Sequence, residues 1–127
     1  MRTSDFIKKA RRVRKRLGGG WRQSGYVAAA GIYALDKNIT RLKDDHLKAR
    51  ELGHILKSRP EIIDILPIDT NIVIFKLDPT ISSTDYVNQL AQKGILAAPF
   101  GKQHVRLVTH LDFSDDDVEE FRKRMKN

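Results

Sequence analysis

Residues 70–77 read TNIVIFKL, and this run of β-branched and aromatic residues decides the fold that we expect. Such residues favour strands, in which successive side chains point to opposite faces of a sheet. Residues 62–66, IIDIL, have the same character, and Pro67-Ile68-Asp69 between the two runs is typical of a turn. The two runs therefore predict two neighbouring strands.

Helix signals follow this pair of strands. We expect a helix to begin at Ser82, because Asp85 three residues later completes a capping box. Gly94 suits the left-handed conformation that ends helices. The same start signal recurs at Ser114 and Asp117, which predicts a last helix near the end of the sequence.

Two short runs between these helices, residues 95–100 (ILAAPF) and 105–111 (VRLVTHL), are interpreted as strands. The order of elements after Pro60 is therefore β-β-α-β-β-α, a small α+β layer with helices on one face. Arg106 lies inside the second run. Strand alternation makes it a residue of the solvent face or a residue directed at an anion, and the sequence leaves both open.

The first half of the sequence has helical periodicity. Ser4 or Asp5 is expected to cap a first helix, and Gly18 to end it. Residues 27–35, VAAAGIYAL, are apolar on nearly all sides, which is typical of a helix packed against other helices. A third, long helix ends near Ser58. The apolar face of the first helix is formed by Phe6, Ala10, Val13 and Leu17.

Charge is distributed unevenly along the 127 residues. The net charge is +8, but residues 1–60 carry 16 Lys/Arg against 5 Asp/Glu. This basic half invites an anionic partner such as a phosphate group, nucleic acid or an acidic protein surface. The absence of cysteine excludes disulfides and thiolate chemistry and fits a cytoplasmic protein. No apolar run approaches the roughly 18 residues that span a membrane, so no membrane partner is expected.

The stretch KRLGGGWRQSG, residues 15–25, matches neither the Walker pattern nor a dinucleotide fingerprint. Three consecutive glycines before a helix leave backbone N–H groups available to an anion, with Lys15 and Arg22 on either side. A plain helix–helix connector explains the same residues. The basic face of the first helix is likewise either solvated or directed at nucleic-acid phosphates.

No triad, carboxylate pair or histidine spacing typical of a metal site stands out, so we predict no catalytic residue and no metal site.

Several stretches, taken together and in collinear order, resemble the C-terminal part of the low-specificity L-threonine aldolases. These are FIKKARRVRKRLGGGWRQSGYVAAAGIYAL (6–35), DDHLKARELG (44–53), TNIVIF (70–75), GILAAPFG (94–101) and VRLVTHLDFS (105–114).

The resemblance implies a pyridoxal-phosphate enzyme of the aspartate-aminotransferase fold, fold type I. Residues 1–57 would be the tail of the large domain with the interdomain helix, and residues 58–127 the small C-terminal domain. Such enzymes cleave β-hydroxy-α-amino acids, threonine to glycine and acetaldehyde. Lys15 and Arg22 would bind the cofactor phosphate of a neighbouring subunit in a dimer or tetramer, and Arg106 the substrate carboxylate.

The family's Schiff-base lysine, the histidine stacked on the cofactor and the acid at its pyridine nitrogen lie N-terminal to the matched region. We therefore expect a C-terminal fragment that has no aldolase activity alone, with a missing N-terminal half as its partner. Its apolar helix at 27–35 would then expose surface when isolated. Two alternatives stay open: a stand-alone basic module that binds nucleic acid or another anion, and a subunit completed by a separately encoded half.

Overall fold

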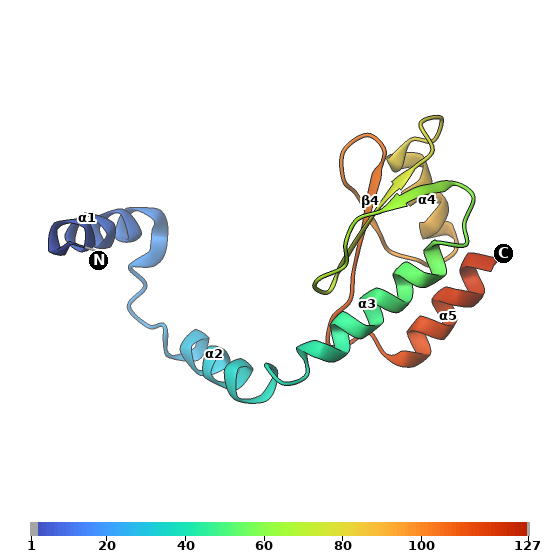
Figure 1. Cartoon of the computed structure of the whole chain (residues 1–127). Helices are drawn as coiled ribbons and strands as arrows, with labels where there is room; N and C mark the ends of the chain where they lie inside the picture. Colours follow the sequence, from blue (N-terminus) through green and yellow to red (C-terminus); the bar gives the residue numbers. More distant parts are fainter. Residues whose placement is uncertain (1–2, 127) are drawn as a thin grey trace. The chain divides into compact units, whose positions relative to one another are not determined.

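The computed structural model describes residues 3–126 (Figure 1). The chain divides into two units, an N-terminal unit that ends at Ile39 and a C-terminal unit that begins at Thr40. Each unit is described by itself. No helix between Thr3 and Lys126 combines the length and the apolar character needed to cross a bilayer.

The C-terminal unit is built on a four-stranded antiparallel sheet in the order β1-β2-β4-β3. The central pair is in register, with Phe75 opposite Val105 and Ile74 opposite Arg106. The first two strands are the ones that the β-branched runs predict. The strands are β1 (Ile62–Ile65), β2 (Ile72–Leu77), β3 (Ala98–Pro99) and β4 (His104–Val108).

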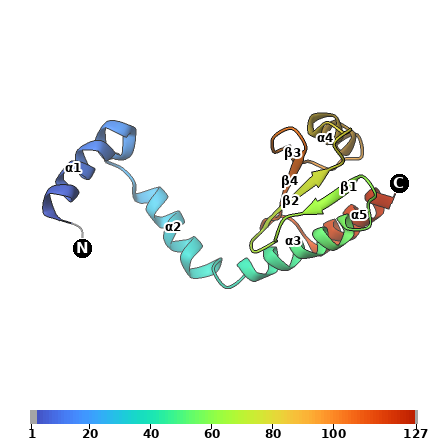
Figure 2. The same ribbon diagram turned by 45° about the horizontal axis from the view of Figure 1, so that its top comes forward.

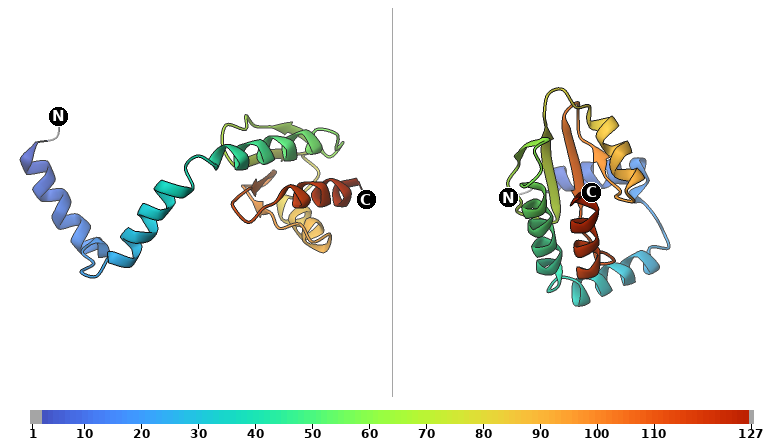
Figure 3. Two further views of the ribbon diagram at one scale, coloured as in Figure 1. Left: turned by 90° about the horizontal axis from the view of Figure 1, so that it is seen from below. Right: turned by 90° about the vertical axis from the view of Figure 1, so that its right-hand side faces the viewer.

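Three helices cover one face of this sheet, as the sequence predicts for a small α+β layer (Figures 2 and 3). The buried side of β2 packs under them, and the ring of Phe75 meets Tyr86 of α4 edge to face, with ring centroids 6.1 Å apart. Helices α3 and α5 run side by side (Figure 3). The helices are α3 (Leu42–Leu56), α4 (Ser83–Gln92) and α5 (Asp115–Lys126).

The end of β4 is tied to α3 by a buried hydroxyl. Thr109 is fully buried, and its Oγ1 donates to the Asp45 carbonyl at 2.7 Å. The Asn71 amide donates in turn to the Thr109 carbonyl at 2.7 Å. Arg41 pairs bidentately with Asp45 at 2.8 and 3.1 Å. These contacts satisfy the polar groups of a buried junction, which holds β4 in place relative to α3.

The helix starts agree only partly with the predicted caps. The Ser114–Asp117 capping box is confirmed: both Ser114 donors bind the Asp117 carboxylate at 2.7 Å. Ser82 occupies the N-cap position, but its side chain makes no capping hydrogen bond. The predicted Ser82–Asp85 capping box is therefore wrong. The first helix is capped by Thr3, which accepts from the Phe6 N–H, and not by Ser4 or Asp5.

The N-terminal unit is helical and has no buried residue between Thr3 and Ile39. It comprises α1 (Ser4–Arg14), a kinked segment η1 (Lys15–Gly19) in which Leu17 and Gly18 depart from helical geometry, and α2 (Gly25–Lys37). The apolar residues of α2 are exposed, with 94% of Tyr26 and 67% of Leu35 accessible. Helix α2 therefore presents apolar surface all round its axis.

The two faces of β2 give a direct test of the fold. Phe75→Ala removes a fully buried ring and should destabilise the C-terminal unit by roughly 3–5 kcal/mol. Ile74→Ala, one residue away on the face without helices, should cost about 1 kcal/mol. Urea unfolding followed by far-ultraviolet circular dichroism measures both. Equal losses in the two variants would contradict this assignment of the core.

The start of α5 should depend on pH. Hydrogen bonds from the Ser114 hydroxyl and N–H hold the pKa of Asp117 below its ordinary value. Because the folded pKa is the lower one, the cap stabilises α5 fully above the unfolded pKa and is lost as pH falls through the folded pKa. Secondary ¹³Cα shifts of residues 115–118 should therefore lose helical character below about pH 4. Asp117→Asn should remove this transition, and an unchanged titration in that variant would contradict the assignment.

Candidate functional site

Arg106 stands on the face of the sheet that carries no helix. Burial alternates along β4: Val105 and Leu107 are buried, whereas Arg106 and Val108 are exposed. Since β4 lies between β2 and β3, Arg106 is flanked by Ile74 on one side and Ala98 on the other. This exposed placement is compatible with both alternatives that the sequence leaves open, a solvated side chain and one directed at an anion.

The surroundings of Arg106 on this face are apolar on one side and polar on the other. Ile72 and Val108 face each other across the strands and are 40% and 46% exposed. In the other direction, Lys76 pairs with His104 in register, and Asp64 of β1 lies opposite Lys76. Within residues 3–126 no carboxylate lies within ion-pairing distance of Arg106, so its guanidinium is available to an external anion.

The glycine loop of the N-terminal unit folds back onto the end of α1. Gly18 has φ +88°, the left-handed conformation that the sequence predicts at the end of this helix. A Cβ at Gly19 would lie 2.5 Å from Cγ of Arg14, and one at Gly20 would lie 2.8 Å from Cγ of Lys15. A larger residue at either position would therefore force the Arg14 or Lys15 side chain to move, so glycine favours this close approach of the loop to the basic helix.

Lys15 lies in a cluster of cations that the glycine pattern alone does not reveal. Arg12, Lys15 and Arg16 line a cleft of about 420 Å³ on this unit. Their spacing of three and four residues, which puts them on one helical face, is the sequence signal that identifies this group. Arg22 is exposed in the connection before α2 and is not among the residues that line the cleft. In the described part of the chain, none of these four cations has an acidic partner.

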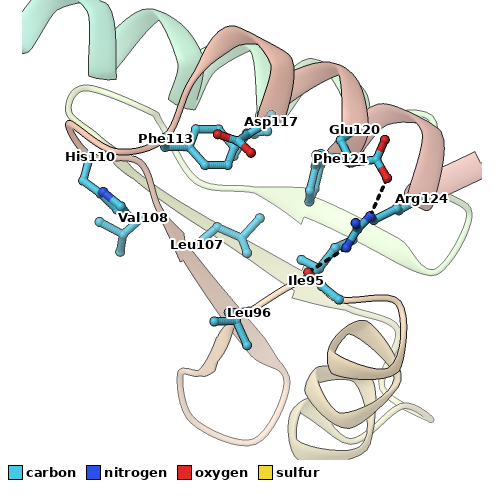
Figure 4. A pocket seen from close by; sticks show the side chains of 12 residues that line it. Ile95, Leu96, Leu107, Val108, His110, Phe113, Asp117, Glu120, Phe121 and Arg124 are labelled. Carbon is cyan, nitrogen blue, oxygen red and sulfur yellow. Dashed lines mark hydrogen bonds and ion pairs between the residues drawn. The ribbon is translucent and has the colours of Figure 1, made fainter.

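A hollow of the C-terminal unit beside α5 has a mixed polar and apolar lining, and most of its charges are already paired (Figure 4). Its volume is about 370 Å³. Arg124 reaches from α5 to the carbonyls of Lys93 and Gly94, at 2.9 and 3.0 Å, and binds Glu120 at 2.9 Å. Asp117 is engaged by Ser114. The hollow therefore offers apolar surface but little unpaired charge for recognition.

The beta-eliminating lyase family model matches residues 1–80. The chain belongs to this family. A probable low-specificity L-threonine aldolase 2 of Arabidopsis thaliana is 38% identical over 117 residues, covering 90% of this chain and 33% of the relative. The low specificity L-threonine aldolase of Escherichia coli K12 is 39% identical over 117 residues, covering 91% and 33%. The resemblance on which the sequence prediction rests is thereby confirmed, and the chain spans about a third of the length of these relatives.

Solved structures agree on the fold. An acetylornithine aminotransferase from Elizabethkingia anophelis matches 79% of this chain and 27% of its own, with TM-score 0.60 and 19% identity. A cystine C-S lyase bound to cysteine persulfide matches 65% and 23%, with TM-score 0.56 and 15% identity. The chain thus has the fold of part of a fold type I pyridoxal-phosphate enzyme, which confirms the predicted α+β class.

Proposed function

We propose that this chain supplies phosphate-binding and carboxylate-binding residues to a pyridoxal-phosphate-dependent lyase that cleaves β-hydroxy-α-amino acids, threonine to glycine and acetaldehyde. The observation that carries this proposal is Arg106, an unpaired guanidinium on the helix-free face of the sheet, in a chain of the beta-eliminating lyase family. We take the reaction from the names of the aldolase relatives. The unpaired cations of this chain support the proposed binding of phosphate and carboxylate.

Arg106 suits the carboxylate of an amino acid. A guanidinium presents two parallel N–H donors to two carboxylate oxygens, which fixes both the position and the rotation of the substrate. Its rigid neighbours Ile74 and Ala98 belong to flanking strands of the sheet, so the arginine stem is supported on both sides. An orientation fixed in this way sets the direction of the substrate's Cα–Cβ bond within the site. Holding a substrate in the reactive geometry accounts for a large part of the rate acceleration by enzymes.

Lys15 and Arg22 suit the cofactor phosphate. Both are exposed and lack acidic partners within residues 3–126, and the glycines between them carry no Cβ that would crowd an anion. Arg12 and Arg16 add positive charge beside Lys15. Pyridoxal phosphate, when bound, supplies an acceptor for the electrons of the breaking Cα–Cβ bond. We infer that these cations reach the phosphate in a homo-oligomer, as the resemblance implies.

No lysine of this chain is assigned to the imine with the cofactor. We assign that lysine, with the other residues that contact the cofactor ring, to the two thirds of the relatives' length that the match does not cover. These residues are supplied by the same polypeptide or by a second one. Accordingly, the 127 residues alone should not release glycine from threonine, and turnover by them would contradict this assignment.

The role of Arg106 can be tested by complementation. The chain is co-expressed with the part of the Escherichia coli relative that the match does not cover, and glycine formation from threonine is measured. Arg106→Gln should lower kcat/KM by roughly 100-fold, because a charged hydrogen-bonding partner of the substrate is lost. Lys76→Gln, on the same face of the sheet, is the matched control. Equal effects of the two substitutions would contradict a specific role of Arg106.

Phosphate binding by the N-terminal unit has a separate test. Pyridoxine 5′-phosphate, which has no aldehyde to react with lysines, is titrated against the chain while the fluorescence of Trp21 is followed. Lys15→Ala and Arg22→Ala should each weaken binding about tenfold, whereas Arg11→Ala should not. If the alternative nucleic-acid module is correct, all three variants should instead weaken salt-dependent binding of random-sequence duplex.

A further inference from the structure

We propose that the C-terminal unit has a second anion-binding site, in a groove between α3 and the connection from β1 to β2. Its ligand would be a small phosphate or carboxylate compound that also carries an apolar group. The site involves none of the residues assigned to the cofactor or the substrate, so it stands independently of the function proposed above.

The groove has a cationic wall and an apolar wall. Its volume is about 270 Å³. Helix α3 contributes Arg50, His54 and Lys57, and the opposite wall consists of residues 65–68, Ile-Leu-Pro-Ile. An anionic group would meet the helix while an apolar group lies against the connection, so the groove fits an amphipathic acid better than a bare ion.

The cationic wall is not neutralised by the protein. Arg50, His54 and Lys57 are spaced by four and three residues, which puts them on one face of α3. Between Thr3 and Lys126 none of the three has a carboxylate within ion-pairing distance. Other charges of the same helix are paired: Lys48 contacts Asp115 at 3.8 Å, and Glu51 binds Arg122. Arg50 and Lys57 therefore both present positive charge to the groove, and a bound anion would supply the missing counter-charge.

The apolar wall is held against the helix by a specific contact. Gly53 lies between Arg50 and His54, and a Cβ at this position would overlap Cδ1 of Ile68. Glycine therefore lets the Ile68 side chain pack directly against the backbone of α3. Leu66, which is 38% exposed, is fixed at its backbone by a hydrogen bond from its N–H to the Ile74 carbonyl at 2.9 Å. The groove is thus formed before a ligand arrives, which lowers the entropic cost of binding.

The groove is separate from Arg106. It lies at the β1 edge of the sheet, whereas Arg106 stands on β4, with β2 between the two strands. Its cations also belong to a helix on the covered face, and Arg106 points from the other face. The larger hollow beneath α5 is a weaker candidate, because Arg124, Glu120 and Asp117 in its lining already have partners.

Residue-resolved NMR on the full chain tests this site, because it separates the groove from the cations of the N-terminal unit. Phenyl phosphate should shift the backbone amides of residues 50–57 and 65–68, and inorganic phosphate should bind there more weakly. Arg50→Gln and Lys57→Gln should each weaken binding of both compounds about tenfold. Both side chains are exposed, so the fold should persist. Lys43→Gln, an exposed residue of α3 outside the groove, is the matched control.

A further variant tests the apolar wall. Leu66→Ser should weaken phenyl phosphate and leave inorganic phosphate unchanged, since it removes apolar contact and no charge. The site is ruled out if the groove amides do not shift, or if Lys43→Gln weakens binding as much as Arg50→Gln does. Equal affinity for the two phosphates would overturn the assignment of an amphipathic ligand.

Discussion

The burial of one face of β2 is the constraint on which the C-terminal unit depends. Val73, Phe75 and Leu77 are fully buried, and β2 lies between β1 and β4. A shift of one residue in its register would turn all three side chains into solvent and bring Ile72 and Ile74 inward. The packing of Phe75 on Tyr86 therefore fixes the register, and the register in turn puts Arg106 opposite Ile74 on the open face.

Polar contacts complete the packing where the helices meet the sheet. Arg59, after α3, donates to the Met125 carbonyl at the end of α5 and to Glu61 at 3.1 Å. Glu61 also accepts from the Tyr86 hydroxyl at 3.1 Å. Burial and the nearby Glu61 carboxylate raise the pKa of Tyr86, so its hydroxyl keeps its proton to higher pH than an ordinary tyrosine does. This network joins the residues after α3 to the end of α5 and to Tyr86 of α4.

The sequence predicts those features that depend on local rules. Strand periodicity predicts β2, a left-handed residue is correctly expected at Gly18, and the Ser114–Asp117 pair predicts the start of α5. Ser82 fails as a side-chain cap although its spacing to Asp85 is correct, because spacing alone does not fix a rotamer. The contact of Arg59 with Met125 joins residues far apart in sequence, and no local pattern encodes it. Arg106 could be named from the sequence, but its face could be decided only by strand pairing.

The distribution of paired and unpaired charges separates structure from recognition in this chain. Arg41 and Arg122 each have a carboxylate partner close by: Arg41 pairs with Asp45 at the start of α3, and Arg122 joins α5 to Glu51 of α3. Within residues 3–126, Arg106 and Lys15 have no carboxylate partner. Arg106 lies on a paired strand of the sheet, and Lys15 lies beside the glycine loop. A solvated lysine or arginine on a mobile stem loses side-chain entropy when it binds an anion. A cation whose stem is held by neighbouring residues loses less, and Arg106, flanked by Ile74 and Ala98 on the adjacent strands, is such a cation.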